Sequence, residues 1–115
     1  MQTVKLIDIA HGRSGDKGND SNIGIIARHI DLYPFLKKKL TAAVVKEQMK
    51  NICKGKVERY ELPNIGALNF VLHRSLDGGG TVSLKLDAQG KTHASQLLRM
   101  DIKVPEELLE KVNSQ

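Results

Sequence analysis

The sequence has few aromatic residues, one cysteine and no long apolar run. Its 115 residues include no tryptophan, two tyrosines and two phenylalanines, so a core must be built from Leu, Ile, Val and Ala. The single cysteine, Cys53, excludes a disulfide scaffold and a multi-cysteine zinc site. No apolar run approaches the roughly 20 residues of a membrane-spanning helix, and the first residues lack the pattern of a signal peptide. We therefore expect one cytoplasmic domain over residues 1–115, with a reduced thiol and no membrane partner.

The net charge of +5 comes from one part of the sequence. Residues 37–59 hold eight cations and only two anions, so the remaining sequence is nearly neutral. Four lysines fall on one face of the helix predicted there: Lys39, Lys46, Lys50 and Lys54. The simplest interpretation is that this face is exposed to solvent. Docking to an acidic partner or to the phosphates of CoA, and binding to RNA, are the alternatives. The separation of the aromatic residues disfavours nucleic acid, because base-stacking platforms need exposed aromatic side chains.

The pattern of apolar residues predicts an α+β fold with a mixed or antiparallel sheet. Alternating apolar residues predict strands near residues 4–9, 21–28, 56–62, 67–73, 82–86 and 100–104. One long helix is expected from Asp31, its N-cap, to about Cys53, with Pro34 in its first turn, a break near Thr41 and Gly55 after its end. One or two short helices are expected, over residues 91–98 and from Pro105, as the first helical residue, onward.

The segment from His11 to Asp20 holds the densest group of polar residues, and its composition predicts an irregular, Gly-rich loop. Glycines allow backbone N–H groups to approach a ligand, and the cations of the segment would attract a phosphate or a carboxylate. The alternative is a structural loop that satisfies its own polar groups. The candidate ligand-binding residues are Arg13, Ser14, Asp16, Lys17, Asn19 and Asp20, with Arg74 as a further contact for an anion.

No residue pattern identifies a catalytic group. The four histidines are scattered without the spacing of metal ligands, so we expect neither a metal ion nor a cofactor. His11 would act as a general base only if a carboxylate of the segment at 11–20 oriented its ring. Ser14 lies in the sequence GRSGD, which is not the nucleophile elbow of hydrolases. Cys53 follows the apolar face of the predicted helix and is expected in the core.

Four segments together resemble one protein family. They are RSGDKGNDSNIGI (Arg13–Ile25), LPNIGALNFVL (Leu62–Leu72), LDGGG (Leu76–Gly80) and LDAQGKT (Leu86–Thr92). Over about residues 3–105, the sequence resembles the C-terminal domain of the acyclic terpene utilisation protein A (AtuA-like) family. The resemblance implies a ferredoxin-like sandwich, with an N-terminal β-hairpin whose tip is the segment at 10–20. It transfers no catalytic residue.

The resemblance also implies a biochemical setting. The family is associated with the breakdown of acyclic terpenoids and branched acids through CoA thioesters, and its small domain usually follows a larger N-terminal domain. We therefore expect an accessory subunit that self-associates into a homo-oligomer and docks with a larger AtuA-like N-terminal domain protein. The alternative is a small enzyme or ligand-binding protein in which the segment at 11–20 holds an anionic ligand, either an acyl-CoA or a carboxylate.

Overall fold

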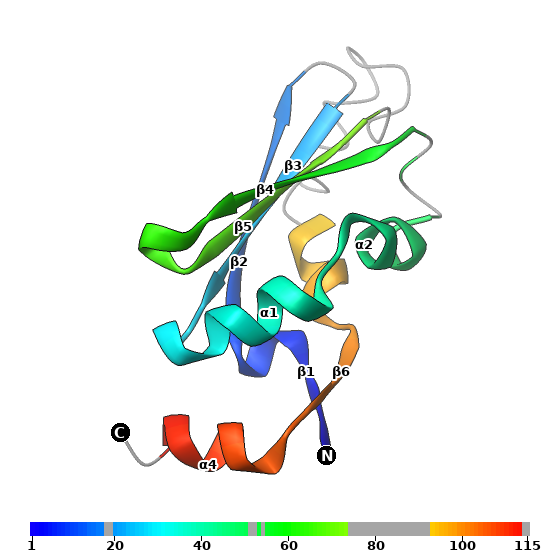
Figure 1. The fold of residues 1–115 in the computed structure, drawn as a ribbon. Helices are drawn as coiled ribbons and strands as arrows, with labels where there is room; N and C mark the ends of the chain where they lie inside the picture. Colours follow the sequence, from blue (N-terminus) through cyan, green and yellow to red (C-terminus); the bar gives the residue numbers. More distant parts are fainter. Residues whose placement is uncertain (18–19, 51–52, 54, 74–92, 114–115) are drawn as a thin grey trace.

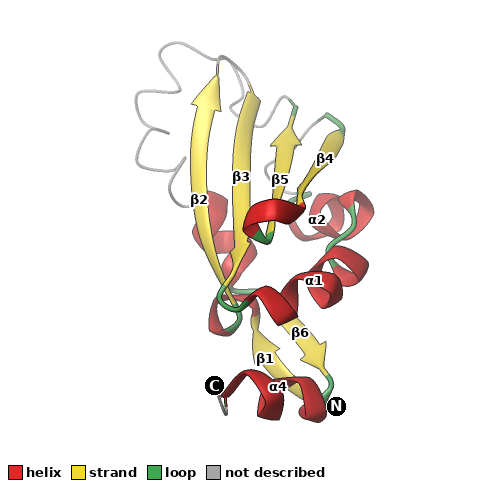
Figure 2. Ribbon diagram, turned by 60° about the vertical axis from the view of Figure 1, so that its left-hand side comes forward, coloured by secondary structure: helices red, strands yellow, loops and turns green. Residues whose placement is uncertain are grey.

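The computed structural model describes residues 1–17, 20–50, 53, 55–73 and 93–113. Its larger sheet has the strand order β2-β3-β5-β4, and each pair of neighbours is antiparallel (Figure 2). The strands are β2 (Ala10–Lys17), β3 (Asp20–Ala27), β4 (Val57–Leu62) and β5 (Ala67–Leu72). Strands β3 and β4 therefore run parallel with β5 between them, which is the split β-α-β arrangement of ferredoxin-like folds. The predicted ferredoxin-like α+β fold with an added N-terminal hairpin is confirmed.

The prediction of an irregular loop over residues 10–20 is wrong. Strand β2 continues to Lys17, and residues 18 and 19 lie outside the described residues. The glycines of β2 are tolerated because its neighbours supply the packing. A Cβ on Gly12 would lie only 2.8 Å from Cδ1 of Leu98, so a larger residue would require the Leu98 side chain to move. Composition alone hides this strand, because its glycines and charged residues favour a turn and its packing partner Leu98 lies far away in the sequence.

The helices cover one side of this sheet (Figure 1). Helix α1 (Tyr33–Lys39) packs beside β3, α2 (Ala42–Gln48) packs beside β4, and a further helix spans residues 93–98. Alternate residues of the two central strands face the helices and are fully buried: Ile23, Ile25, Leu68, Phe70 and Leu72. The residues between them point to the opposite, uncovered face of the sheet. Such an alternation along each strand is expected of an antiparallel sheet with one solvated face.

The helical segment after β3 is broken at the predicted place. Thr41 caps α2, because its Oγ1 accepts a hydrogen bond from the backbone N–H of Val44 at 3.1 Å. Pro34 stands in the first turn of α1, as predicted. Asp31 is not the N-cap: the Nδ1 of His29 accepts a hydrogen bond from the backbone N–H of Asp31, and a short 3₁₀ helix (Ile30–Leu32) precedes α1.

Gly55 does not end the long helix, because α2 already ends at Gln48. The backbone N–H of Gly55 instead donates to the carbonyl of His73 at 2.9 Å and brings the entry of β4 beside the end of β5. Cys53 is buried next to this contact, as expected for a core residue, and its Sγ lies 3.4 Å from the same carbonyl. Lys54 lies outside the described residues, and Lys39, Lys46 and Lys50 are exposed.

A second, two-stranded sheet joins the two ends of the chain. Strand β1 (Gln2–Lys5) pairs antiparallel with β6 (Asp101–Val104). Helix α4 (Glu106–Asn113) begins one residue after Pro105, the predicted first helical residue. The first strand does not continue to Ile9, because residues Leu6–Asp8 form a 3₁₀ turn that buries Leu6. The strand predicted at 82–86 lies outside the described residues.

Candidate functional site

Cross-strand register separates neighbouring residues of β2 onto the two faces of the sheet. Arg13 pairs with Gly24, Gly24 with Asn69 and Asn69 with Tyr60, which forms one row on the uncovered face. The next row runs from Ser14 through Ile23 and Phe70 to Arg59 and faces the helices. Arg13 is accordingly exposed, whereas the Oγ of Ser14 is buried. The two candidates therefore differ in solvation although they are adjacent in sequence.

A cavity of about 360 Å³ lies between β2 and the helix at 93–98. Its lining residues are Gly12, Arg13 and Ser14 from the strand and Ala94, Ser95 and Leu98 from the helix. Among the described residues, the buried Oγ of Ser14 has no hydrogen-bond partner. This hydroxyl is available to a bound group, since a buried hydroxyl without a partner is energetically unfavourable.

One buried hydrogen bond fixes the helical wall of this cavity. The Nδ1 of His93 lies 3.1 Å from the Oγ of Ser21, and both residues are 2% exposed. Burial lowers the pKa of His93 below its ordinary value of 6.5, so the ring is neutral at pH 7. The sequence analysis missed this pair, because a lone histidine and a lone serine carry no motif. It also missed the lining residues Ala94, Ser95 and Leu98.

Asp20, a third candidate, belongs to a different group at one end of the sheet. Its Oδ2 lies 3.0 Å from Nδ1 of His73, and Nε2 of His73 lies 2.7 Å from Oε1 of Glu58. The hydroxyl of Tyr60 donates to Oε2 of Glu58 at 2.8 Å. Hydrogen bonds from Tyr60 first, then from His73 and Lys56, lower the pKa of Glu58 to about 2. Both ring nitrogens of His73 are engaged, so this group ties β3, β4 and β5 together and does not offer a free base.

The remaining candidates are only partly located. Asp16 pairs in register with Ser21, and Lys17 pairs with Asp20. Asn19 and Arg74 lie outside the described residues. Arg13 and Ser14 therefore line one cavity, whereas Asp20 belongs to the group around His73. His11 has a separate contact, since its Nε2 lies 3.3 Å from Nη1 of Arg28.

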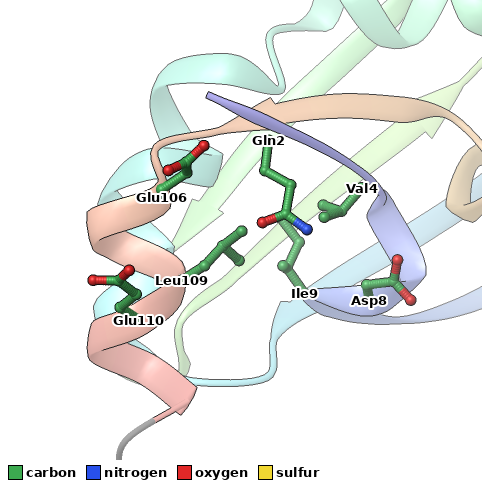
Figure 3. A pocket seen from close by; sticks show the side chains of 7 residues that line it. All are labelled: Gln2, Val4, Asp8, Ile9, Glu106, Leu109 and Glu110. Carbon is green, nitrogen blue, oxygen red and sulfur yellow. The ribbon is translucent and has the colours of Figure 1, made fainter.

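A second cavity of about 360 Å³ lies between the two-stranded sheet and α4 (Figure 3). Three carboxylates surround it, those of Asp8, Glu106 and Glu110, over a floor that includes Val4 and Leu109. These carboxylates would repel the anionic ligand expected from the sequence. One of them already has a structural role, because Oδ2 of Asp8 accepts a hydrogen bond from the backbone N–H of Lys5 at 3.1 Å.

Among the described residues, no group of three His, Cys, Asp or Glu side chains is arranged to hold a metal ion. Nor does any described helix have the length and apolar character needed to span a membrane.

The sequence model of the AtuA ferredoxin-like domain matches residues 4–103. This chain belongs to the AtuA ferredoxin-like domain family. No curated protein and no solved structure matches it significantly. The matched span of this AtuA ferredoxin-like domain includes both walls of the cavity between β2 and the helix at 93–98. Glu106, Leu109 and Glu110 of the acidic cavity lie beyond it. The cavity beside β2 is therefore the better candidate for a site that is part of the domain itself.

Proposed function

We propose that this AtuA ferredoxin-like domain is a cytoplasmic accessory unit that docks with a larger AtuA-like N-terminal domain protein in acyl-CoA or acyclic terpenoid catabolism. The observation that carries the proposal is an apolar patch around the turn between β4 and β5. Ile30, Leu62 and Ile65 are 57%, 44% and 61% exposed. Cδ1 of Ile30 lies 3.0 Å from where a Cβ on Gly66 would stand, so this side chain reaches the turn. Exposed apolar groups gathered in this way are typical of docking surfaces.

Copurification with a larger AtuA-like N-terminal domain protein tests the proposal. The double substitution Leu62→Asp and Ile65→Asp should abolish copurification, because it places two charges in the centre of the patch. Ile7→Asp is the matched control, since Ile7 is 47% exposed on the 3₁₀ turn after β1. Retained copurification of the double variant, or an equal loss in the control, would contradict docking through this patch.

We also infer that the domain forms a homo-oligomer through the uncovered face of the sheet. A two-fold axis parallel to the strands would bring β2 of one copy over β4 of the other. The row Arg13, Gly24, Asn69 and Tyr60 would then place a guanidinium over an aromatic ring, with small or amide side chains between them. Light scattering should give at least twice the mass of 12.7 kDa. The substitution Asn69→Lys should reduce that mass to the monomer value, and a parent protein that is monomeric would contradict the inference.

The second candidate function is binding of an anionic ligand, either an acyl-CoA or a carboxylate, as a small enzyme or a binding protein. It is favoured by one observation, that Arg13 and Ser14 line the same cavity. Thermal unfolding measured with CoA thioesters and with phosphate tests it. These ligands should stabilise the parent protein, whereas the double variant Arg13→Ala and Lys17→Ala should lose the stabilisation. Equal shifts for the parent and the variant would contradict this function.

A further inference from the structure

We propose that the outer edge of β2 binds an extended segment of a partner protein as an added strand. The segment has acidic side chains on one face and small apolar side chains on the other. The apolar side chains enter the cavity between β2 and the helix at 93–98, and the acidic side chains lie beside Arg13. This inference rests on the proposed docking function, because it names the chemistry of a second contact with the partner.

The hydrogen-bond pattern of the sheet identifies the backbone groups at this edge. The N–H of Arg28 donates to the carbonyl of Ile9, and the N–H of Ala27 donates to the carbonyl of Gly66. In an antiparallel ladder, such pairs recur at every second residue. His11, Arg13 and Gly15 therefore bond to β3, whereas the N–H and C=O groups of Gly12 and Ser14 point away from it. Within the described residues, no strand pairs with β2 on that outer side.

The cavity runs along the same edge. Gly12 and Ser14, whose backbone groups point outward, line it together with Ala94 and Leu98 of the helix. The absence of a side chain at Gly12 lets Leu98 approach the strand closely. A groove between an edge strand and a helix is the geometry in which domains bind an extended peptide by strand addition. In that mode, backbone hydrogen bonds supply the affinity and the groove receives alternate side chains. The small and apolar lining selects small apolar side chains.

Charge favours an acidic partner segment over a second copy of this strand. His11 and Arg13 are exposed on the other face of β2, and the guanidinium of Arg28 lies beside the ring of His11. In a two-fold pairing of two β2 strands centred on Arg13, two guanidinium groups would lie opposite each other, which is destabilising. Carboxylates at those positions would instead form favourable cross-strand pairs.

The test uses an eight-residue peptide of alternating Glu and Val, with blocked ends, at pH 7. Binding is measured by fluorescence anisotropy, and amide exchange is followed by NMR. The amides of Gly12 and Ser14 should become protected when the peptide binds. Ser14→Pro removes one outward N–H and leaves the hydrogen bonds to β3 in place. It should weaken binding about tenfold or more, whereas Lys38→Ala, on the exposed surface of α1, should keep the parent affinity. A peptide with Lys in place of Glu should not bind.

Other results would overturn the proposal. If the amides of Gly12 and Ser14 are protected in the monomer without peptide, another part of the chain already covers the edge. If Ser14→Pro lowers the mass measured by light scattering, the edge binds a second copy. Should Ser14→Pro fail to fold, a peptide with N-methyl groups on alternate amides tests the same hydrogen bonds on the parent protein, and its undiminished binding would refute strand addition. Copurification abolished by the Leu62→Asp and Ile65→Asp substitutions would still support the proposed docking function in each of these cases.

Discussion

Ser21 and His93 are 72 residues apart in the sequence, yet the Oγ of Ser21 lies 3.1 Å from the Nδ1 of His93 in the interior. The contact joins β3 to the start of the helix at 93–98 and so positions one wall of the cavity beside β2. Because both residues are almost fully buried, neither group can exchange its partner for bulk water.

The first prediction concerns the strength of this contact. Ser21→Ala removes the hydroxyl that faces the buried imidazole, so the free energy of unfolding should fall by about 1–3 kcal/mol. Urea denaturation followed by circular dichroism measures the change. Asn22→Ala is the control, because Asn22 is the exposed neighbour on the opposite face of β3. Equal losses of stability in the two variants would show that the contact between Ser21 and His93 does not contribute to the free energy of unfolding.

The second prediction concerns pH. Burial lowers the pKa of His93 in the folded protein, whereas in the unfolded chain the pKa returns to about 6.5. As the pH falls below about 6.5, the unfolded chain takes up a proton that the folded protein does not, so stability decreases. His93→Gln should flatten the dependence of the urea midpoint between pH 7 and pH 5, relative to the parent. Parallel pH profiles for the two proteins would contradict the assignment.

The third prediction concerns acid unfolding. The hydrogen bonds from Tyr60, His73 and Lys56 lower the pKa of Glu58 from 4.5 to about 2. The stabilisation by the ionised carboxylate is therefore present above about pH 4.5 and is lost as the pH falls through about 2. Glu58→Gln should lower the melting temperature at pH 6, and the gap between parent and variant should close as the pH approaches 2. A gap that does not change with pH would indicate lost packing and not lost charge.

The fourth prediction compares two glycines. A Cβ on Gly55 would lie 2.7 Å from the carbonyl oxygen of His73, a backbone atom that cannot rotate away. A Cβ on Gly24 would meet nothing closer than 3.9 Å. Gly55→Ala should therefore destabilise the domain by about 1–3 kcal/mol, the usual cost of overpacking, and Gly24→Ala should have little effect. Thermal unfolding of both variants is the measurement, and the reverse order would refute the close approach of β4 to β5.

The fifth prediction concerns Arg59, which faces the helices from β4. Its Nη1 donates to the carbonyls of Lys37 and Leu40 at 2.6 and 3.0 Å. It thereby supplies hydrogen bonds to carbonyl groups at the C-terminal end of α1, where partners within the helix are lacking. Arg59→Lys keeps the charge but not the planar donor group, so about 1–2 kcal/mol of stability should be lost. Lys38→Ala on exposed α1 surface should change stability by less than about 0.5 kcal/mol. A harmless Arg59→Lys substitution would contradict the capping role.

Sequence patterns identified those elements whose signal is local. Alternating apolar residues located β4, β5 and β6, and proline followed by acidic residues located the start of α4. The break before α2 was also predictable from the sequence, because Thr41 accepts a hydrogen bond from a backbone N–H only three residues away. The pattern of apolar residues predicted the α+β class, and the resemblance to the family added the ferredoxin-like topology.

Contacts outside each segment decided the rest. The composition of β2 predicts a loop, because the residues that stabilise its extended structure are those of β3, with which it pairs, and Leu98, against which it packs. Arg13 and Ser14 line one cavity although strand alternation directs them to opposite faces of the sheet, and Asp20 instead contacts His73. The sequence by itself therefore determined the composition of the core and the local periodicities of this domain. Only the tertiary structure decided which polar residues share a site, because that depends on register and packing between segments that no local pattern connects.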